Sequence, residues 1–339
     1  FNSNQKNKIL LPMKVLVIGS GGREHAIVDA LTRSPQVEKI YCAPGNAGIA
    51  RQAECVDIRD TEVGRLRDFA RGEGIGLTVV GPEAALAAGI VDSFREAGLR
   101  IFGPTKAAAR IESSKEFAKD LMARYDIPTA GYRAFTDYEA ARAYVAARPF
   151  PAVLKYDGLA AGKGVVIAQT MEEADEALRQ MLLDDKFGEG KVVVEDFLEG
   201  PEFSLLCFVS GRRVWPMVLS QDHKRAYDGN QGPNTGGMGT IAPNPYYTPE
   251  VAAECMEKIF LPTIHAMNAE GCPFKGCLYF GLMLTPDGPK VIEYNCRFGD
   301  PETQVVLPLL ESDLLAIMRA CASGTLSAEQ VVFRRGAAC

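Results

Sequence analysis

The stretch Val15-Leu16-Val17-Ile18-Gly19-Ser20-Gly21-Gly22-Arg23-Glu24-His25 joins an apolar run to a glycine-rich turn and then to a helical pattern. Glycines in such a turn let the backbone approach a ligand closely, and the N-terminus of the helix attracts an anion. The alternation continues along the chain, with further strands predicted at 39–42, 77–80 and 100–102 and helices at 61–71 and 84–97. Strands that alternate with helices of this length predict βαβ units on a parallel sheet.

The glycine-rich turn does not match a dinucleotide site. The G-x-G-x-x-G pattern would need glycine where Glu24 stands, and the second strand runs into Ala43-Pro44-Gly45 without an acidic residue. A nicotinamide-dependent dehydrogenase is therefore disfavoured. The same geometry suits a phosphorylated small molecule, with Arg23 as a contact. The alternative is that the glycines only allow close packing of helix on strand.

A second block follows Pro104 and mixes helices with antiparallel strands. Ser113 and Glu116 stand three apart before an apolar helical pattern, which predicts a capping box. Further helices are predicted at 137–147, 171–183 and 249–270, and strands at 152–155, 165–168, 192–195, 203–209, 214–220, 278–285 and 290–294. We expect a tag, leader or cloning residue over 1–12, an N-terminal α/β domain over 13–113, lobes over 114–200 and 201–328, and the start of a further domain over 329–339.

Composition narrows the class of protein. With 37 basic and 43 acidic residues among 339, the formal charge is −6, which argues against a nucleic-acid binder. Apolar runs are far shorter than the ~20 residues of a membrane-spanning helix. The nine cysteines form no C-x-x-C pair, so reduced thiols are expected rather than disulfides or zinc, and we expect a cytoplasmic protein. The sequence contains neither H-E-x-x-H nor G-x-S-x-G, which disfavours metalloprotease and serine-hydrolase chemistry.

A cationic hairpin is predicted at residues 155–166, which read Lys-Tyr-Asp-Gly-Leu-Ala-Ala-Gly-Lys-Gly-Val-Val. It is not a P-loop, because three residues separate Gly158 from Gly162 and Gly164 follows Lys163. Such a loop can close over a triphosphate with backbone N–H groups while lysines neutralise charge. A solvated surface hairpin is the alternative.

Three acidic or glycine-rich segments complete the set. Glu293 and Asn295 point to the same face of a predicted strand, and two oxygen ligands of this kind suit Mg²⁺. Arg297 could then meet a carboxylate or phosphate, although a structural cluster of salt bridges would have the same sequence. The acidic turn at 194–204 could bind an adenine and a ribose, although acidic turns are usually only solvated. The long loop at 221–241 is typical of a substrate-binding lid.

Together, these segments resemble the ATP-grasp superfamily and, within it, the phosphoribosylamine–glycine ligase family. The stretches that carry the resemblance are Ile18–His25, Pro44–Gly48, Gly81–Glu83, Glu112–Lys119, Gly158–Val165, Gln221–Arg225, Gly232–Gly239 and Glu293–Gln304. The resemblance implies an N-terminal parallel α/β domain followed by a two-lobed ATP-grasp α+β fold. It implies that ATP and Mg²⁺ (or Mn²⁺) serve to join glycine to 5-phosphoribosylamine through glycyl phosphate.

The resemblance also implies roles for individual residues. For ATP these are the phosphate-binding lysines Lys115 and Lys155, the phosphate loop with Gly158, Gly162, Lys163 and Gly164, the adenine hinge with Glu195, Phe197 and Leu198, and Glu202 at the ribose. For the metal they are Glu293 and Asn295. For the other substrates they are, less specifically, Gly21, Gly22, Arg23, Asn46, Glu83, Lys224, Arg225, Asn234, Gly236 and Arg297. The residues expected to take part in catalysis are Arg297, Lys155 and Asp222.

Family members normally continue for roughly another domain, so we read the end of this sequence as a truncation. Two alternatives therefore stay open beside the ligase: a non-catalytic fragment that binds MgATP, and an ATP-grasp ligase with other substrates. The expected partners are the small molecules glycine and 5-phosphoribosylamine, without nucleic acid or membrane, and the expected assembly is a monomer or weak dimer.

Overall fold

The computed structural model describes residues 12–159, 164–184, 190–229, 231–235, 237–327 and 330–339. Its first unit is a parallel sheet of order β3-β2-β1-β4-β5. The strands are β1 (Met13–Gly19), β2 (Val37–Pro44), β3 (Glu54–Cys55), β4 (Leu77–Val80) and β5 (Ile101–Phe102). The chain order reverses between β2 and β4, at β1, so the glycine-rich turn lies at the switch point where ligands bind in open α/β sheets. The predicted parallel sheet is confirmed.

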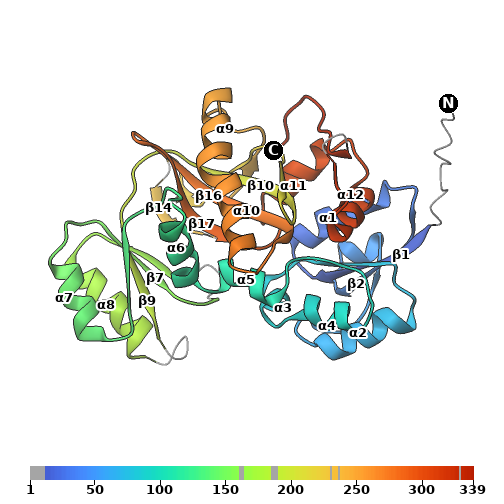
Figure 1. Ribbon diagram of the computed structural model, residues 1–339, viewed down its shortest axis with the longest axis horizontal. Helices are drawn as coiled ribbons and strands as arrows, with labels where there is room; N and C mark the ends of the chain where they lie inside the picture. Colours follow the sequence, from blue (N-terminus) through green and yellow to red (C-terminus); the bar gives the residue numbers. More distant parts are fainter. Residues whose placement is uncertain (1–11, 160–163, 185–189, 230, 236, 328–329) are drawn as a thin grey trace.

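Helices cover both faces of this sheet (Figure 1). They are α1 (Gly22–Thr32), α2 (Val63–Gly72), α3 (Glu83–Ala87), α4 (Ile90–Glu96) and, from the end of the chain, α12 (Leu314–Ser323). The side chains of β1 alternate between two cores: Leu16 and Ile18 pack with α2 and α4, while Val15 and Val17 pack with α1 and α12. This alternation explains why β1 is apolar without interruption.

Two local predictions are wrong in detail. The helix predicted at 84–97 is two helices, because Gly89 takes a left-handed backbone conformation with φ of 86° and ends the first helical segment. The cap of α6 (Lys115–Arg124) is Ser114 rather than Ser113, and the Ser114 hydroxyl accepts a hydrogen bond from the Phe117 N–H at 3.2 Å. Glu116 is therefore not part of a capping box, and its carboxylate pairs with Lys191 instead.

The second unit is a small antiparallel sheet of order β6-β9-β7-β8, at the left of Figure 1. The strands are β6 (Tyr132–Phe135), β7 (Ala152–Tyr156), β8 (Val165–Ala168) and β9 (Val192–Asp196), and the helices α7 (Tyr138–Ala146) and α8 (Met171–Leu182) cover it. Its core is separate from the rest of the molecule. Strands β7 and β8 form the predicted cationic hairpin, whose tip at 160–163 lies outside the described residues.

The third unit is a larger antiparallel sheet of order β11-β10-β16-β17 in the centre of the molecule (Figure 1). Its strands are β10 (Glu202–Ser210), β11 (Arg213–Pro216), β16 (Lys275–Thr285) and β17 (Gly288–Asn295). Helices α5 (Lys106–Ser113), α6, α9 (Pro249–Cys255) and α10 (Leu261–Ala269) pack around it, and α11 (Thr303–Val306) follows β17. A π-helical segment joins α9 to α10 just before Pro262, which has no N–H to donate to a preceding turn.

The segment 221–241, predicted as one long loop, contains two small ladders. Strand β12 (Gln221–Asp222) pairs with β15 (Thr240–Ile241), and β13 (Arg225–Tyr227) pairs with β14 (Gln231–Asn234). The first ladder places Asp222 next to β10, since Ser220 is bridged to Ser204.

Three further observations complete the fold. Ala338 and Ala242 exchange backbone hydrogen bonds of 2.8 and 2.9 Å, so the last residues lie against the segment after β15. The nine cysteines are free thiols, seven of them buried, while Cys55 and Cys339 are exposed. Within the described ranges, no helix is both long and apolar enough to cross a membrane.

Candidate functional site

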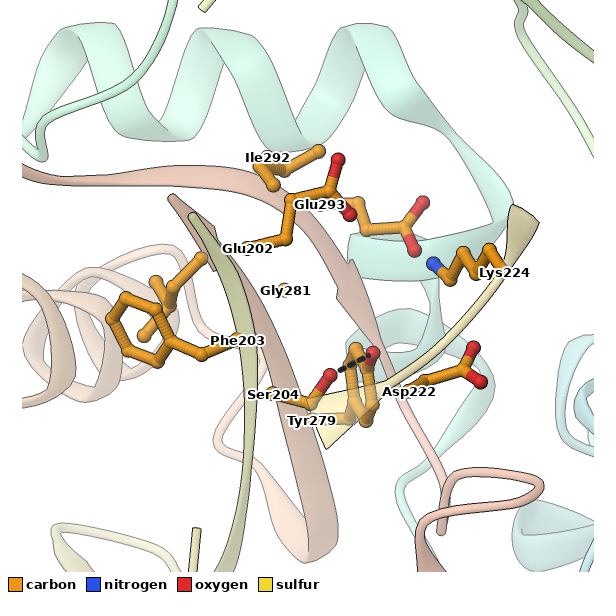
Figure 2. Close-up of a pocket in the computed structure, with 10 residues that line it drawn as sticks. Glu202, Phe203, Ser204, Asp222, Lys224, Tyr279, Gly281, Ile292 and Glu293 are labelled. Atoms are coloured by element: carbon orange, nitrogen blue, oxygen red, sulfur yellow. Dashed lines mark hydrogen bonds between the residues drawn. The ribbon is translucent and has the colours of Figure 1, made fainter. Parts of the chain in front are cut away.

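A pocket opens beside the large sheet (Figure 2). The residues that line it are Glu202, Phe203, Ser204, Asp222, Lys224, Tyr279, Gly281, Leu282, Ile292 and Glu293. They come from β10, β12, β16, β17 and the segment after β12. In Figure 2 the Lys224 side chain points toward the carboxylates of Glu202 and Glu293. The pocket thus joins three of the residues predicted for ATP, metal and substrate.

Glu293 is the centre of the charge distribution. Burial raises the pKa of this carboxyl group, but the neighbouring cations Lys224, Lys155, Lys115 and Arg297 outweigh it and hold the pKa below its usual value. Conversely, burial lowers the pKa of Lys224, but carboxylates led by Glu293 raise it overall. Glu293 is therefore ionised, and it faces cations from several separate elements.

Glu293 and Asn295 lie two residues apart on one face of β17, as predicted. Their partners across the ladder are Gly281 and Tyr279 of β16. A Cβ at Gly281 would lie 3.0 Å from the Glu293 Cγ, so the glycine leaves room for the glutamate side chain. Both side chains offer oxygen atoms as metal ligands. In the described part of the chain, no group of three or more His, Cys, Asp or Glu side chains could hold a metal. Two oxygen ligands near the predicted phosphate lysines fit Mg²⁺, which keeps substrate oxygens and water as its other ligands.

Two predicted phosphate lysines bridge the small lobe and the large sheet. Lys115, the first residue of α6, donates to the Gly158 carbonyl at 3.0 Å. Burial and the nearby Lys155 lower the pKa of Lys115. Lys155, on β7, donates to the carbonyl of Ile292 at 2.9 Å. Ile292 is the residue before Glu293. Lys155 thus contacts the strand that carries the predicted metal ligands, and both lysines act electrostatically on Glu293.

The predicted hinge follows β9. The Glu195 carboxylate is 4% exposed and lies between Lys155 and Lys119, with N–O distances of 2.9 and 2.8 Å. Its predicted adenine contact can come from the backbone, because the side chain is already paired with both lysines. Phe197 is exposed, Leu198 is half-buried, and Glu202 reaches the pocket from the first position of β10. The roles of these four residues toward ATP stay predictions.

Arg297 is held between two carboxylates. Its guanidinium lies 3.1 Å from the Glu83 Oε2 and 3.1 Å from the Glu112 Oε1. Burial lowers the pKa of Arg297, but Glu112 and Glu83 raise it overall. The Glu112 Oε2 also accepts the Cys296 N–H at 2.7 Å. Glu83, predicted as a substrate contact, thus orients the predicted catalytic arginine.

The glycine-rich turn is closed by protein groups. The Glu24 Oε2 accepts the Gly21 N–H at 2.6 Å, and the Glu24 Oε1 accepts from the Arg23 Nε at 2.7 Å. The Arg23 N–H donates to Asp300 at 3.2 Å, at the N-terminus of α1. A Cβ at Gly22 would lie 2.7 Å from the Gln304 amide nitrogen. The Asn46 side chain also bonds within the protein, since its amide donates to the Ser20 carbonyl and its oxygen accepts from the Gly48 and Ile49 N–H groups.

Asp222 is half-buried in the pocket wall. Burial and the nearby Glu302 raise the pKa of Asp222 to about 6. Its buried Oδ1 has no hydrogen-bond partner among the described residues. A carboxylate with a raised pKa and a vacant acceptor oxygen is suited to take a proton near neutral pH.

The remaining predicted residues divide by position. The Gly164 carbonyl accepts the Tyr156 N–H at 2.7 Å and closes the hairpin. Arg225 is exposed and donates to the Gly232 carbonyl at 2.7 Å, outside the pocket lining. Gly162, Lys163 and Gly236 lie outside the described residues, as does the side chain of Asn234.

Sequence reasoning missed several polar residues of the site. Ser204 and Tyr279 share a 2.7 Å hydrogen bond across the pocket floor (Figure 2). The Tyr279 hydroxyl also donates to Glu302 at 3.1 Å. Lys119 and Glu112 were also missed as individual residues. One signal was available: Lys119 follows Lys115 by four positions and therefore shares its helix face.

The comparisons with known proteins agree with this geometry. The family model for the phosphoribosylglycinamide synthetase N domain matches residues 13–112, and the model for its ATP-grasp (A) domain matches 113–303. The phosphoribosylamine–glycine ligase of Listeria monocytogenes is 56% identical over 311 residues, which are 91% of this chain and 74% of that protein. The corresponding protein of Halalkalibacterium halodurans is 55% identical over 314 residues, 92% of this chain and 73% of its own length.

Solved structures show the same fold. The crystal structure of phosphoribosylamine–glycine ligase from Thermotoga maritima superposes with a TM-score of 0.80 at 33% identity, covering 92% of this chain and 76% of that one. A biotin carboxylase complex from Campylobacter jejuni has a TM-score of 0.74 at 15% identity, covers 96% of this chain and 74% of that one, and shows the fold alone. The two-lobed arrangement predicted from the sequence is thereby confirmed. This chain belongs to the phosphoribosylamine–glycine ligase family, a family of carboxylate–amine ligases with the ATP-grasp fold.

Proposed function

We propose that this chain uses ATP to join glycine to 5-phosphoribosylamine, giving glycinamide ribonucleotide, ADP and phosphate. The observation that carries the proposal is the convergence of Lys115, Lys155 and Lys224 on Glu293, from three separate elements. A triphosphate bound with Mg²⁺ requires oxygen ligands for the metal and positive charges for the phosphates. Strand β17 offers the oxygen ligands, and the three lysines offer the positive charges. The relatives from Listeria monocytogenes and Halalkalibacterium halodurans, which are 56% and 55% identical to this chain over the aligned residues, supply the substrates.

In the first step, a glycine carboxylate oxygen attacks the γ-phosphorus of ATP, and the bond to the bridging oxygen of ADP breaks. The protein contributes position and charge rather than a covalent group. Lys115 and Lys155 bind phosphate oxygens, and Arg297, held by Glu83 and Glu112, binds the glycine carboxylate. Glu293 and Asn295 would hold Mg²⁺ (or Mn²⁺), which supplies neutralisation of the phosphate charge when bound.

In the second step, the amine of phosphoribosylamine attacks the carbonyl carbon of glycyl phosphate and expels phosphate. The nitrogen loses one proton in forming the amide. Asp222 is the acceptor that we propose, because its Oδ1 lies buried in the pocket wall without a partner among the described residues. Its pKa of about 6 keeps the carboxylate ionised at neutral pH, so it can accept this proton.

For the remaining substrate groups, position supports the following assignments. The hinge at Glu195, Phe197 and Leu198 would receive the adenine, and Glu202 the ribose. The phosphoribosyl group would lie near the β1–α1 turn, at the switch point of the parallel sheet. Of the residues predicted there, Arg23 and Asn46 already bond to protein groups through their side chains, and the Gly21 and Arg23 backbone N–H groups donate to Glu24 and Asp300.

We also propose a cytoplasmic setting and a monomer or weak dimer. The support for the first is chemical: seven buried free thiols are typical of a reducing compartment. Sedimentation at several protein concentrations tests the second.

The decisive experiment measures ADP release with MgATP, glycine and freshly generated phosphoribosylamine, omitting each substrate in turn. ADP release that requires both glycine and the amine supports the proposal. ADP release that ignores glycine but responds to another acid identifies a ligase with other substrates. MgATP binding without any turnover leaves a nucleotide-binding fragment and contradicts the proposed activity for this chain.

A further inference from the structure

Lys119 is a buried lysine that the proposed reaction does not use. It lies on α6, one turn after Lys115, and its side chain is 3% exposed. Its ammonium group lies 2.8 Å from the Glu195 Oε2 and donates to the Thr129 hydroxyl at 2.8 Å. Thr129 in turn donates to the Val291 carbonyl of β17 at 2.7 Å. Burying an ammonium group is costly, so this residue needs a reason beyond packing.

Glu195 is shared between two lysines. One carboxylate oxygen lies 2.8 Å from the Lys119 Nζ, and the other lies 2.9 Å from the Lys155 Nζ. The cluster of two ammonium groups and one carboxylate carries a net charge of +1. Without Lys119 the carboxylate would neutralise Lys155 alone, and the net charge would be zero.

We propose that Lys119 is a positioning residue, which takes up the charge of Glu195 and thereby leaves Lys155 available to a nucleotide phosphate. This inference rests on the proposed role of Lys155 at the ATP phosphates. Lys119 does not reach the nucleotide itself in this assignment. Its effect passes through the shared carboxylate.

The groups that face Lys119 come from three strands. Glu195 lies on β9, Lys155 on β7, and the ring of Tyr132 on β6, with its centroid 5.8 Å from the Lys119 Nζ. The Tyr132 hydroxyl donates to the carboxylate of Asp120, the residue that follows Lys119 on α6. Burial lowers the pKa of Lys119 to about 8, although Glu195 opposes the shift. Above that pH Lys119 loses its charge, which has the same effect as removing it.

The test is a double-mutant cycle on MgADP binding, measured by calorimetry. Lys119→Met keeps an unbranched side chain that is one atom shorter and removes its charge. With Glu195 present, this change is expected to weaken MgADP binding by about tenfold, within the usual range for coupled buried charges. Once Glu195→Gln is in place, the same change should have little effect, because no carboxylate is left to hold Lys155.

Two controls accompany the cycle. Lys258→Met removes an exposed lysine that pairs with Glu254 four residues earlier, and it should leave MgADP affinity unchanged. The pH dependence of binding gives an independent readout: affinity of the unaltered chain should fall as pH rises through about 8. That fall should disappear in the Lys119→Met/Glu195→Gln double variant. If Lys119→Met alone does not fold, this comparison of pH dependence between the unaltered chain and the double variant still tests the proposal. The double variant should fold, because it buries no unpaired carboxylate.

Equal weakening by Lys119→Met with and without Glu195→Gln would overturn the proposal, because it would show a structural role only. No weakening in either background would overturn it as well. Failure of the proposed ligase activity looks different: the unaltered chain would bind MgADP but would release no ADP from ATP in response to glycine. Failure of the assumed role of Lys155 would show as unchanged affinity in Lys155→Met.

Discussion

Glu293 is the proposed metal ligand, and its replacement gives the first prediction. Glu293→Gln should lower turnover by roughly 100-fold, the scale on which loss of one preorganised charge-stabilising group acts. Thermal stability should change little, because Lys224 keeps Glu202 and Asp222 as neighbours. Turnover against Mg²⁺ concentration is the measurement, and higher Mg²⁺ should restore part of the loss. Glu176→Gln, at an exposed glutamate of α8, is the matched control. Unchanged turnover would exclude the metal role.

Asp222 gives a prediction about pH. Its pKa is raised to about 6, so the group is protonated below that pH and cannot accept the amine proton there. The turnover number should therefore fall as pH is lowered through about 6. Asp222→Asn should be slow at every pH and should lack this acid limb. A limb of the same shape in the variant would assign it to another group.

At this scale the sequence predicted residue types better than residue partners. Glu293 and Asn295 were predictable because the two-residue repeat of a strand fixes their common face. The environment of Glu195 was not predictable, because Lys119 and Lys155 reach it from α6 and β7. A local pattern shows an acidic turn, whereas only the folded chain shows which charges neutralise it.

At the scale of the elements, the glycine after β4 leaves room for the side chain that caps the β1–α1 turn. Gly81 follows β4, and a Cβ there would lie 1.9 Å from the Glu24 Oε1. Gly81→Ala should therefore displace the Glu24 cap of α1 and lower the free energy of unfolding by about 2–3 kcal/mol. Urea unfolding of both chains measures the difference. Unchanged stability would show that Glu24 can move without cost.

A matched glycine provides the control. Gly64 lies in α2, and a Cβ there would meet no atom within 4 Å. Gly64→Ala should raise the free energy of unfolding by about 0.5–1 kcal/mol, because alanine loses less backbone entropy in a helix. The opposite signs of the two substitutions separate the effect of contact from that of propensity.

Element existence was predictable because hydrophobic periodicity is a short-range signal. Strands β4 and β8 have the predicted ends, and helix α8 differs by a single residue. The ladders within 221–241 were missed, because their strands are two to four residues long and rich in polar residues and glycine. Such short strands pair only because the bridge between Ser204 of β10 and Ser220 fixes the position of the segment. A contact between distant parts of the chain is not visible in a local sequence pattern.

In the whole molecule, two cores join the parallel sheet to the large antiparallel sheet, while the small lobe has its own. Glu112 of α5 strengthens this junction, since it binds both the Cys296 N–H and Arg297. Glu112→Ala should lower the free energy of unfolding by about 3 kcal/mol, as expected when one partner of a buried ion pair is removed. It should also raise the KM for glycine, because Arg297 loses a support.

Thermal unfolding and glycine saturation curves test this prediction together. Glu139→Ala, at an exposed position of α7, is the control and should change neither quantity noticeably. A stability loss without any change in the KM for glycine would show that Glu112 supports the fold but not the position of Arg297.

The distribution of thiols makes the molecule convenient for spectroscopy. Burial raises the pKa of the seven interior cysteines, so they resist alkylation, whereas Cys55 on β3 and Cys339 remain accessible. A maleimide dye should therefore attach to two sites in the native protein and to nine after denaturation. Replacing either exposed cysteine leaves a single attachment point. Fluorescent reporters can thus be placed on the parallel sheet or beside Ala242 without altering the interior.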